Sequence, residues 1–203
     1  SNGAGNGALS GAVTKVWVNG ADIYVGGAFT NVNNNGTPLP AADYLTKWDG
    51  ANWSALGSDG AGNGAVTGKG GGVINAFGQL GGTLLAGGYF YDLKDAGSVL
   101  PGADFIAGWN GTHWSAVGQV PNGAFANDYP YSQVNAILVN GTDVYVGGYF
   151  TNISNHGVNL PEGDFIAKWD GTNWSALGSN GAGNGSLNYG VSSLAMIGTD
   201  LYV

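Results

Sequence analysis

Two pairs of tyrosines beside asparagine and aspartate are the side chains best suited to bind a ligand. One pair is Tyr89 and Tyr91, and the other lies in the segment from Phe125 to Tyr131. Aromatic rings stack on the faces of sugars or anchor a protein partner, while neighbouring amides and carboxylates bind hydroxyl groups. The candidate binding residues are Tyr89, Tyr91, Asn127, Asp128, Tyr129 and Tyr131. The alternative, which stays open, is that these rings pack against sheet edges.

Three aspartates, Asp43, Asp104 and Asp164, recur in a repeated Leu-Pro-x-x-Asp motif. A residue that repeats at a turn is typical of an Asx-type cap, in which the carboxylate binds nearby backbone. A cation site is the weaker alternative for these carboxylates, because the sequence has no calcium-loop signature such as an EF-hand. We therefore expect no metal centre and no cofactor.

No arrangement of residues points to catalysis. The sequence has no cysteine and 2 histidines, which excludes disulfides and thiolate ligands. His113 replaces the asparagine of a repeated turn, and His156 lies alone in a loop. No Ser-His-Asp set and no carboxylate pair emerges from the spacing. The sequence therefore predicts a protein that is not an enzyme.

Composition excludes one class of partner and indicates a location. Charged residues make up 9% of the chain, and the net charge is -8 with no arginine. Nucleic-acid binding is excluded, because no basic stripe is present to displace counterions from phosphates. No apolar run approaches the length of a membrane span, so we expect no membrane insertion. A surface that is polar through Asn, Ser, Thr and Gly indicates an extracellular or cell-surface protein.

The elements that position these residues belong to a repeat of about 60 residues, and such a period decides the fold. Glycine pairs recur at Gly26-Gly27, Gly87-Gly88 and Gly147-Gly148. Paired tryptophans keep the same step, at Trp48 and Trp53, Trp109 and Trp114, and Trp169 and Trp174. Because glycine has no Cβ, the pairs indicate close approach of another backbone or a large ring. The tryptophans are the rings that we expect there.

Each repeat contains four short apolar strands separated by Asn, Asp and Gly. Alternating apolar and small polar residues are typical of half-buried strands, and the turns after the first and third strands are short enough for hairpins. The sequence therefore predicts an all-β fold: a β-propeller, or a segment of one, with four-stranded antiparallel blades. The predicted blades are residues 12–57, 73–118 and 133–178, and residues 191–203 supply the first half of a fourth.

Long connections are expected at one end of every blade. Between the second and third strands lie residues 30–43, 91–104 and 151–164, and between blades lie residues 58–73, 119–133 and 179–190. The opposite end carries only tight turns. Because binding residues concentrate on loops held by a rigid scaffold, we expect the end with the long loops to carry the site.

The repeated motifs resemble those of a known family. Apolar-Tyr-Val-Gly-Gly, followed by an aromatic residue and a tryptophan after a turn, resembles the kelch motif. The phrase Asp-x-Tyr-Val-Gly-Gly-x-Phe-Thr with Ala-Lys-Trp-Asp-Gly-Thr-Asn-Trp-Ser-Ala-Leu-Gly is closer to long secreted repeat proteins of bacteria, which are similar to galactose-oxidase-type and delta-60-type propellers. The resemblance implies the fold and little about activity. The copper site of galactose oxidase needs tyrosine, histidine and cysteine residues, and with no cysteine and two unclustered histidines that chemistry is not carried over.

Taken together, the sequence favours a non-enzymatic extracellular structural or interaction module that displays loops from one propeller face, as part of a surface assembly or filament. The expected partners are surface polysaccharide or other surface proteins, with self-association through open strand edges. One alternative is a carbohydrate-binding, lectin-like propeller that uses the 119–133 loop. A less favoured alternative is an enzyme completed by residues outside this segment. Half a blade at the end of the sequence favours a segment of a longer chain.

Overall fold

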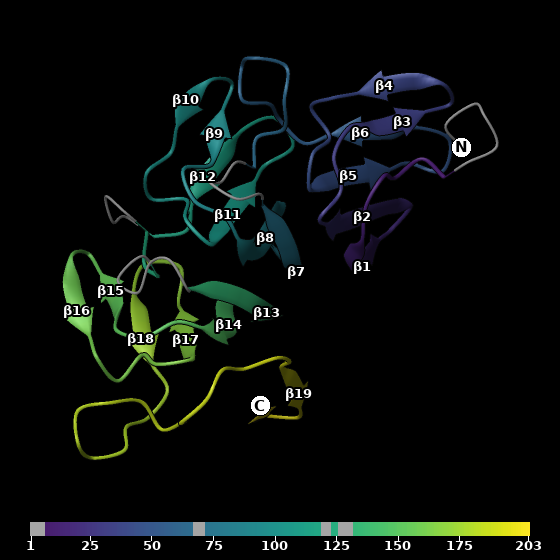
Figure 1. The fold of residues 1–203 in the computed structure, drawn as a ribbon. Coiled ribbons are helices and arrows are strands. Elements are labelled where there is room, and N and C mark those ends of the chain that lie inside the picture. Colours follow the sequence, from purple (N-terminus) through teal and green to yellow (C-terminus); the bar gives the residue numbers. More distant parts are fainter. Residues whose placement is uncertain (1–6, 67–71, 119–122, 126–131) are drawn as a thin grey trace.

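The computed structural model describes residues 7–66, 72–118, 123–125 and 132–203, which form an all-β protein (Figure 1). These described residues form three four-stranded antiparallel sheets and four two-stranded hairpins, without a helix. The predicted all-β class and its four-stranded antiparallel sheets are thereby confirmed. No described segment forms a helix that could span a membrane. The sheets follow one another in an open arc and do not close into a ring.

Each sheet is a meander in which the second and third strands are central. The first sheet contains β1 (Val13–Asn19), β2 (Asp22–Gly27), β5 (Leu45–Trp48) and β6 (Trp53–Ala55). The second sheet contains β7 (Val73–Leu80), β8 (Thr83–Tyr89), β11 (Ile106–Trp109) and β12 (Trp114–Ala116). The third sheet contains β13 (Gln133–Asn140), β14 (Asp143–Tyr149), β17 (Ile166–Trp169) and β18 (Trp174–Ala176). A C-terminal hairpin contains β19 (Ala195–Ile197) and β20 (Asp200–Tyr202).

Two-residue turns join the first strand of each unit to the second. In the first sheet Asn19 pairs with Asp22, which leaves Gly20 and Ala21 as the turn. Gly20 has a φ of 61°, in the left-handed region that glycine enters without a steric cost. The equivalent glycines Gly81, Gly141 and Gly198 have φ of 58°, 63° and 61°. The same turn chemistry therefore fixes the same register in every unit.

The glycine pairs have two separate structural roles. The second glycine, for example Gly27, lies against the backbone of its own first strand, where a β-carbon would overlap the Ala12 carbonyl. The first glycine lies against the next unit, and a β-carbon on Gly26 would be 2.7 Å from the Ile74 side chain. Gly87 meets Val134 and Gly147 meets Val191 in the same way. Each first glycine is thus a joint between consecutive units.

The expectation that tryptophans lie over the glycine pairs is wrong. The residues over the joints are Ile74, Val134 and Val191. The tryptophan of the fourth strand instead meets a single glycine that ends the preceding unit: Trp114 lies over Gly57 and Trp174 over Gly118. Their indole N–H groups donate to the preceding unit, to Leu56 O at 2.7 Å and to Val117 O at 3.3 Å. A branched aliphatic side chain fits the narrow joint, whereas the larger indole takes the outer part of the interface.

A column of small polar residues links the first strands of neighbouring units. The Thr14 hydroxyl donates to the Ile74 carbonyl oxygen of the next unit. Asn75 Nδ2 donates to Asn135 Oδ1 at 3.4 Å, and Asn135 Nδ2 donates to Val191 O at 3.1 Å. Polar bonds therefore accompany the apolar joints at each successive interface.

The connection between the second and third strands of each unit contains a short hairpin, which we call the insertion hairpin. The three are β3 (Val32–Asn34) with β4 (Thr37–Leu39), β9 (Lys94–Asp95) with β10 (Ser98–Val99), and β15 (Ile153–Asn155) with β16 (Val158–Leu160). Each lies beside the fourth strand of its own unit. Asn34 Nδ2 donates to Asn52 Oδ1 at 3.3 Å, at the turn between the third and fourth strands. The insertion hairpins therefore reach the end of the sheet that we expected to carry only tight turns.

The hydrophobic core continues across the interfaces between sheets. One cluster joins the first sheet to the second and includes Leu56, Phe77 and Trp114. Another joins the second sheet to the third and includes Phe105 and Val134. Because apolar area buried between sheets stabilises both neighbours, each unit depends on the next one for part of its core.

Candidate functional site

The tyrosines expected to bind a ligand are only partly tested by the structure. Tyr89 and Tyr91 lie together at the end of β8, with ring centroids 6.4 Å apart in an edge-to-face arrangement. Tyr91 is 9% exposed, and Tyr89 is half-buried against the core. This burial is what the packing alternative expects, and a binding role of the pair stays a prediction. Asn127, Asp128, Tyr129 and Tyr131 lie outside the described residues, so their binding role stays a prediction.

Asp43, Asp104 and Asp164 each hold the start of an insertion hairpin. Their Oδ1 atoms accept hydrogen bonds from the backbone N–H groups of Asn31 at 2.8 Å, Asp92 at 2.8 Å and Asn152 at 3.0 Å. These three acceptor contacts fix residues whose φ values, 52°, 54° and 50°, lie in the left-handed region. The geometry is that of a cap, which is the role the sequence favours. No group of three or more possible metal ligands occurs in the part of the chain that the structure describes.

Burial gives Asp104 an unusual proton affinity. Desolvation raises the pKa of Asp104 from 3.8 to about 6, against the opposing effect of the hydrogen bond from the Asp92 backbone. A carboxyl whose pKa is raised by burial is a common feature of catalytic acids. The Asp104 carboxylate here accepts the hydrogen bond that holds the start of its loop. Its interaction with the Asp92 charge raises the pKa of Asp104 further. We therefore assign it to the loop structure.

The histidines have local partners at the ends of the insertion hairpins. His113 Nδ1 lies 2.9 Å from Asp95 Oδ2, and the Asp95 Oδ1 accepts the Trp114 backbone N–H at 3.2 Å. In the first and third units the same positions hold the pairs Asn34–Asn52 and Asn155–Asn173. His156 Nε2 lies 3.0 Å from Thr172 O. Both histidines therefore help to attach a hairpin tip to a turn.

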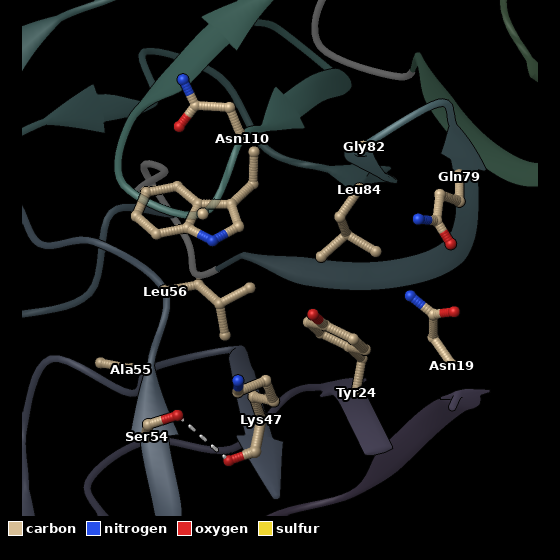
Figure 2. A pocket seen from close by; sticks show the side chains of 12 residues that line it. Asn19, Tyr24, Lys47, Ser54, Ala55, Leu56, Gln79, Gly82, Leu84 and Asn110 are labelled. Atoms are coloured by element: carbon tan, nitrogen blue, oxygen red, sulfur yellow. Dashed lines mark hydrogen bonds between the residues drawn. The ribbon is translucent and has the colours of Figure 1, made fainter. Parts of the chain in front are cut away.

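A groove lies between the first and second sheets, which the sequence did not predict. We call it the first groove; its volume is about 250 Å³. The first sheet and the residue after β6 contribute Asn19, Tyr24, Lys47, Ser54, Ala55 and Leu56. The second unit contributes Gln79, Gly82, Leu84, Trp109, Asn110 and Gly111. Figure 2 shows Tyr24, Leu56 and Leu84 around the groove, with Asn19 and Gln79 at one side.

The charge in the first groove is largely neutralised. Lys47 Nζ lies 3.0 Å from Asp22 Oδ2, and this hydrogen bond raises the pKa of Lys47. Burial, followed by the nearby Asp22 charge, raises the pKa of Tyr24, so its hydroxyl stays protonated at neutral pH. An ion pair with a neutral phenol and side-chain amides makes a site that is polar but carries little net charge.

A second groove, between the second and third sheets, has a different chemistry. It has a volume of about 440 Å³ and is lined by Ala116, Gly118, His156, Trp169, Gly171 and Thr172. The repeat positions of Asn19, Tyr24 and Lys47 are occupied in the second unit by Leu80, Leu85 and Gly108. These three polar side chains of the first groove therefore have no polar counterparts in the second unit.

Sequence reasoning missed the first groove because its residues come from two units and from strands that looked structural. The available signal was the variation between units: Asn19, Tyr24 and Lys47 occupy columns that turn apolar in the second unit. In comparisons with known proteins, no family model matches the chain and no curated protein is similar to it.

Proposed function

We propose that the chain is a propeller-type array of repeat units that serves as a non-enzymatic structural and interaction module outside the cell. Each four-stranded sheet is one blade, and residues 191–203 begin another. In Figure 1 the first strands of the units, β1, β7, β13 and β19, lie toward a common centre, as in propeller blades. The low charge of the surface supports an extracellular location.

The observation that carries this proposal is the exposed apolar face of β1. Val13, Val16 and Val18 are 45%, 54% and 63% exposed. Their equivalents in the second unit include Ile74 and Phe77, which are 0% and 4% exposed because the first sheet covers them. The exposed face of β1 therefore carries the apolar residues that form a joint in the second unit, but no preceding unit covers them in the described residues. Exposed apolar faces of this kind are typical of interaction surfaces.

The partner that fits this face is a repeat unit with an uncovered glycine pair. In the described residues of this chain, Gly26, Gly87 and Gly147 are already covered by Ile74, Val134 and Val191. A second copy of the same chain therefore does not offer the complementary surface. Self-association along the edge of β20, which pairs only with β19 in the described residues, is a second route of assembly. Surface polysaccharide remains the other proposed partner.

An extended chain tests the proposal. Residues 133–178 are fused ahead of Ser1; because residues 1–12 nearly repeat residues 179–190, the fusion keeps the natural spacing between the added Gly147 and Val13. We expect the added unit to cover β1, so hydrogen exchange of the β1 amides slows at least about tenfold and the urea m-value rises with the buried area.

The matched control is the same fusion with Gly147→Val in the added unit, which blocks the joint and restores fast exchange in β1. Circular dichroism first checks that the added unit is folded. If it is folded and the β1 amides of the fusion exchange as fast as in the native chain, the proposal is contradicted. A uniform slowing that Gly147→Val does not reverse would also contradict it.

A further inference from the structure

Several polar groups that line the first groove have no partner in the described structure. The Asn19 amide and the Tyr24 hydroxyl form no hydrogen bond with the described residues, and neither does the Trp109 indole N–H. Gln79 Nε2 donates to Gly81 O at 2.9 Å, which fixes the side chain and leaves Oε1 as an acceptor. Polar groups that are partly enclosed gain most when a ligand satisfies them. The groove therefore offers both donors and acceptors.

These groups come from both sheets and lie on the same groove. Asn19 ends β1 and Gln79 lies near the end of β7, and Figure 2 shows their side-chain amides turned toward each other. Tyr24 comes from β2 and lies beside the apolar side chains of Leu56 and Leu84. Trp109, from β11, adds a half-buried indole to the lining. The groove thus combines apolar and aromatic surface with several hydrogen-bonding groups.

The charge and the size of the groove limit the ligand. The Lys47 ammonium is already paired with Asp22, so an anion would find no free cation and would meet a chain with a net charge of -8. Its volume of about 250 Å³ lies below the roughly 300–1,000 Å³ of sites for drug-sized ligands. A small, neutral ligand with several hydroxyl groups and one apolar face matches both limits.

Comparison between units shows that the combination of Asn19, Tyr24 and Gln79 is particular to the first groove. The third unit keeps Asn140 and Tyr145 at the positions of Asn19 and Tyr24, but the C-terminal hairpin that follows it has Met196 at the position of Gln79. The second unit has Leu80 and Leu85 at the first two positions, and the third unit has Val139 at the position of Gln79. Apolar residues at these positions are therefore compatible with the fold. The polar set at the first groove exceeds what the interface between sheets requires.

The geometry points to the first groove as a binding site for one neutral sugar residue. Trp109 and Tyr24 contact the C–H face of the sugar, as aromatic rings do. Asn19 and Gln79 bind its hydroxyl groups, because an amide both donates and accepts as a hydroxyl does. Asn110 adds only its Nδ2 donor, since its Oδ1 already accepts the Thr112 and His113 backbone N–H groups. This site is separate from the predicted 119–133 loop, and it does not depend on the assembly proposed above.

Titration by NMR tests the assignment with the full chain. The probes are the methyl glycosides of glucose, galactose, mannose and N-acetylglucosamine, with glucuronate as the anionic comparison. We expect at least one neutral glycoside to shift the Trp109 indole N–H resonance in a saturable manner, with a Kd on the order of 1 mM.

The variant Tyr24→Phe removes one hydroxyl group and keeps the shape close to the native one. Gln79→Val replaces the amide side chain with the residue that the third unit has at this position. We expect each to weaken binding about fivefold, and the double variant to weaken it more than tenfold. Tyr145→Phe is the matched control, because Tyr145 occupies the position of Tyr24 in the third unit and leaves binding unchanged. Urea midpoints of all variants check that folding is retained.

Three results would overturn the assignment. The first is the absence of a saturable shift with every neutral glycoside. The second is equal binding by the native chain and the double variant, which would place the ligand elsewhere. The third is binding of glucuronate alone, which would contradict the neutral class of ligand.

Discussion

Gly26 and Gly82 both lie near the joint between the first and second sheets, yet an added methyl group would meet different surroundings. At Gly26 a β-carbon would lie 2.7 Å from the Ile74 side chain and 3.0 Å from its carbonyl oxygen. At Gly82 no heavy atom lies within 4 Å, and neither glycine has a positive φ. The two positions therefore separate steric crowding from glycine's backbone entropy.

We expect Gly26→Ala to lower the free energy of unfolding by about 1–3 kcal/mol, because the joint has to open to admit the methyl group. Gly82→Ala is the control, and we expect it to change the free energy of unfolding by less than about 0.5 kcal/mol. Urea unfolding followed by tryptophan fluorescence measures both. Equal effects of the two substitutions would show that the joint tolerates a side chain.

Asp104 makes the stability of the chain depend on pH. Its pKa is about 6 in the folded state, against 3.8 for the unperturbed group, so between these values the folded state binds more protons than the unfolded state. The contribution of Asp104 to the free energy of unfolding therefore falls as the pH rises from about 4 to about 6. Above about pH 6 this contribution no longer changes with pH. The ionised, partly buried carboxylate is the less stable form in the fold.

Asp104→Asn removes this titration while its side-chain oxygen still accepts the Asp92 N–H. We expect the urea midpoint of the variant, relative to that of the native chain, to rise between pH 4 and pH 6, because only the native chain loses the contribution of Asp104 over this range. Midpoints measured across this range in both proteins provide the test. An identical pH profile in the two proteins would exclude Asp104 as the source.

At the residue scale, the sequence predicted single positions better than groups of positions. The capping role of Asp43 follows from its recurrence at a turn, and the structure has it bonded to the Asn31 N–H. Tyr91 is a predicted binding residue because loop aromatics often bind ligands, and its burial beside Tyr89 has no signal in the local sequence. The first groove needs Tyr24 and Gln79 of different units to meet, and one-dimensional spacing does not give that distance.

Among the elements, each insertion hairpin depends on a bond to the turn beside the fourth strand. In the second unit Asp95 accepts the Trp114 backbone N–H at 3.2 Å and also contacts His113 at 2.9 Å. The side chain of His113 is 67% exposed, whereas that of Asp95 is 18% exposed. The bond to the backbone should therefore stabilise the hairpin more than the contact with the imidazole does.

We expect Asp95→Ala to lower the free energy of unfolding by about 1–3 kcal/mol, because the Trp114 N–H loses its acceptor. His113→Ala should cost less than about 1 kcal/mol, as exposed ion pairs do. The double variant Asp95→Asn/His113→Asn recreates the pair of the first and third units and is expected to keep near-native stability. Thermal unfolding of the three variants gives the comparison, and a larger loss for His113→Ala than for Asp95→Ala would contradict it.

The main strands were predictable and the insertion hairpins were not. Alternating residues and Asn-Gly or Asp-Gly turns identify β1 and β2 directly. The hairpin strands have two or three residues each, too few for a periodic pattern. They form because the preceding linker bonds to them, as Asn33 N does to Ala8 O at 2.9 Å. Tertiary contacts of this kind have no signature in the local sequence.

Across the whole molecule, neighbouring sheets are expected to unfold together because they share side chains. Phe77 of the second sheet contacts Trp17 and Tyr24 of the first, with ring centroids 6.4 Å apart in both pairs. Repeat proteins are stabilised by terms within units and terms between nearest neighbours. Removing Phe77 therefore weakens the second sheet and its coupling to the first.

We expect Phe77→Ala to lower the free energy of unfolding by about 3–5 kcal/mol and to split the urea transition into two steps. Val16→Ala, at the same repeat position in the first unit, is the control, because Val16 is 54% exposed. A single transition of reduced midpoint in Phe77→Ala would mean that the remaining contacts, such as those of Ile74 and Trp114, are enough to keep the two sheets coupled.

The glycine joints recur with the same geometry, since Gly26, Gly87 and Gly147 each receive one branched side chain. A gene encoding such units can grow or shrink by in-frame tandem duplication, because a newly copied unit already carries both halves of the contact it needs. Individual units are then free to diverge in the residues between the joints. The different lining of the two grooves is the kind of divergence that such inheritance permits.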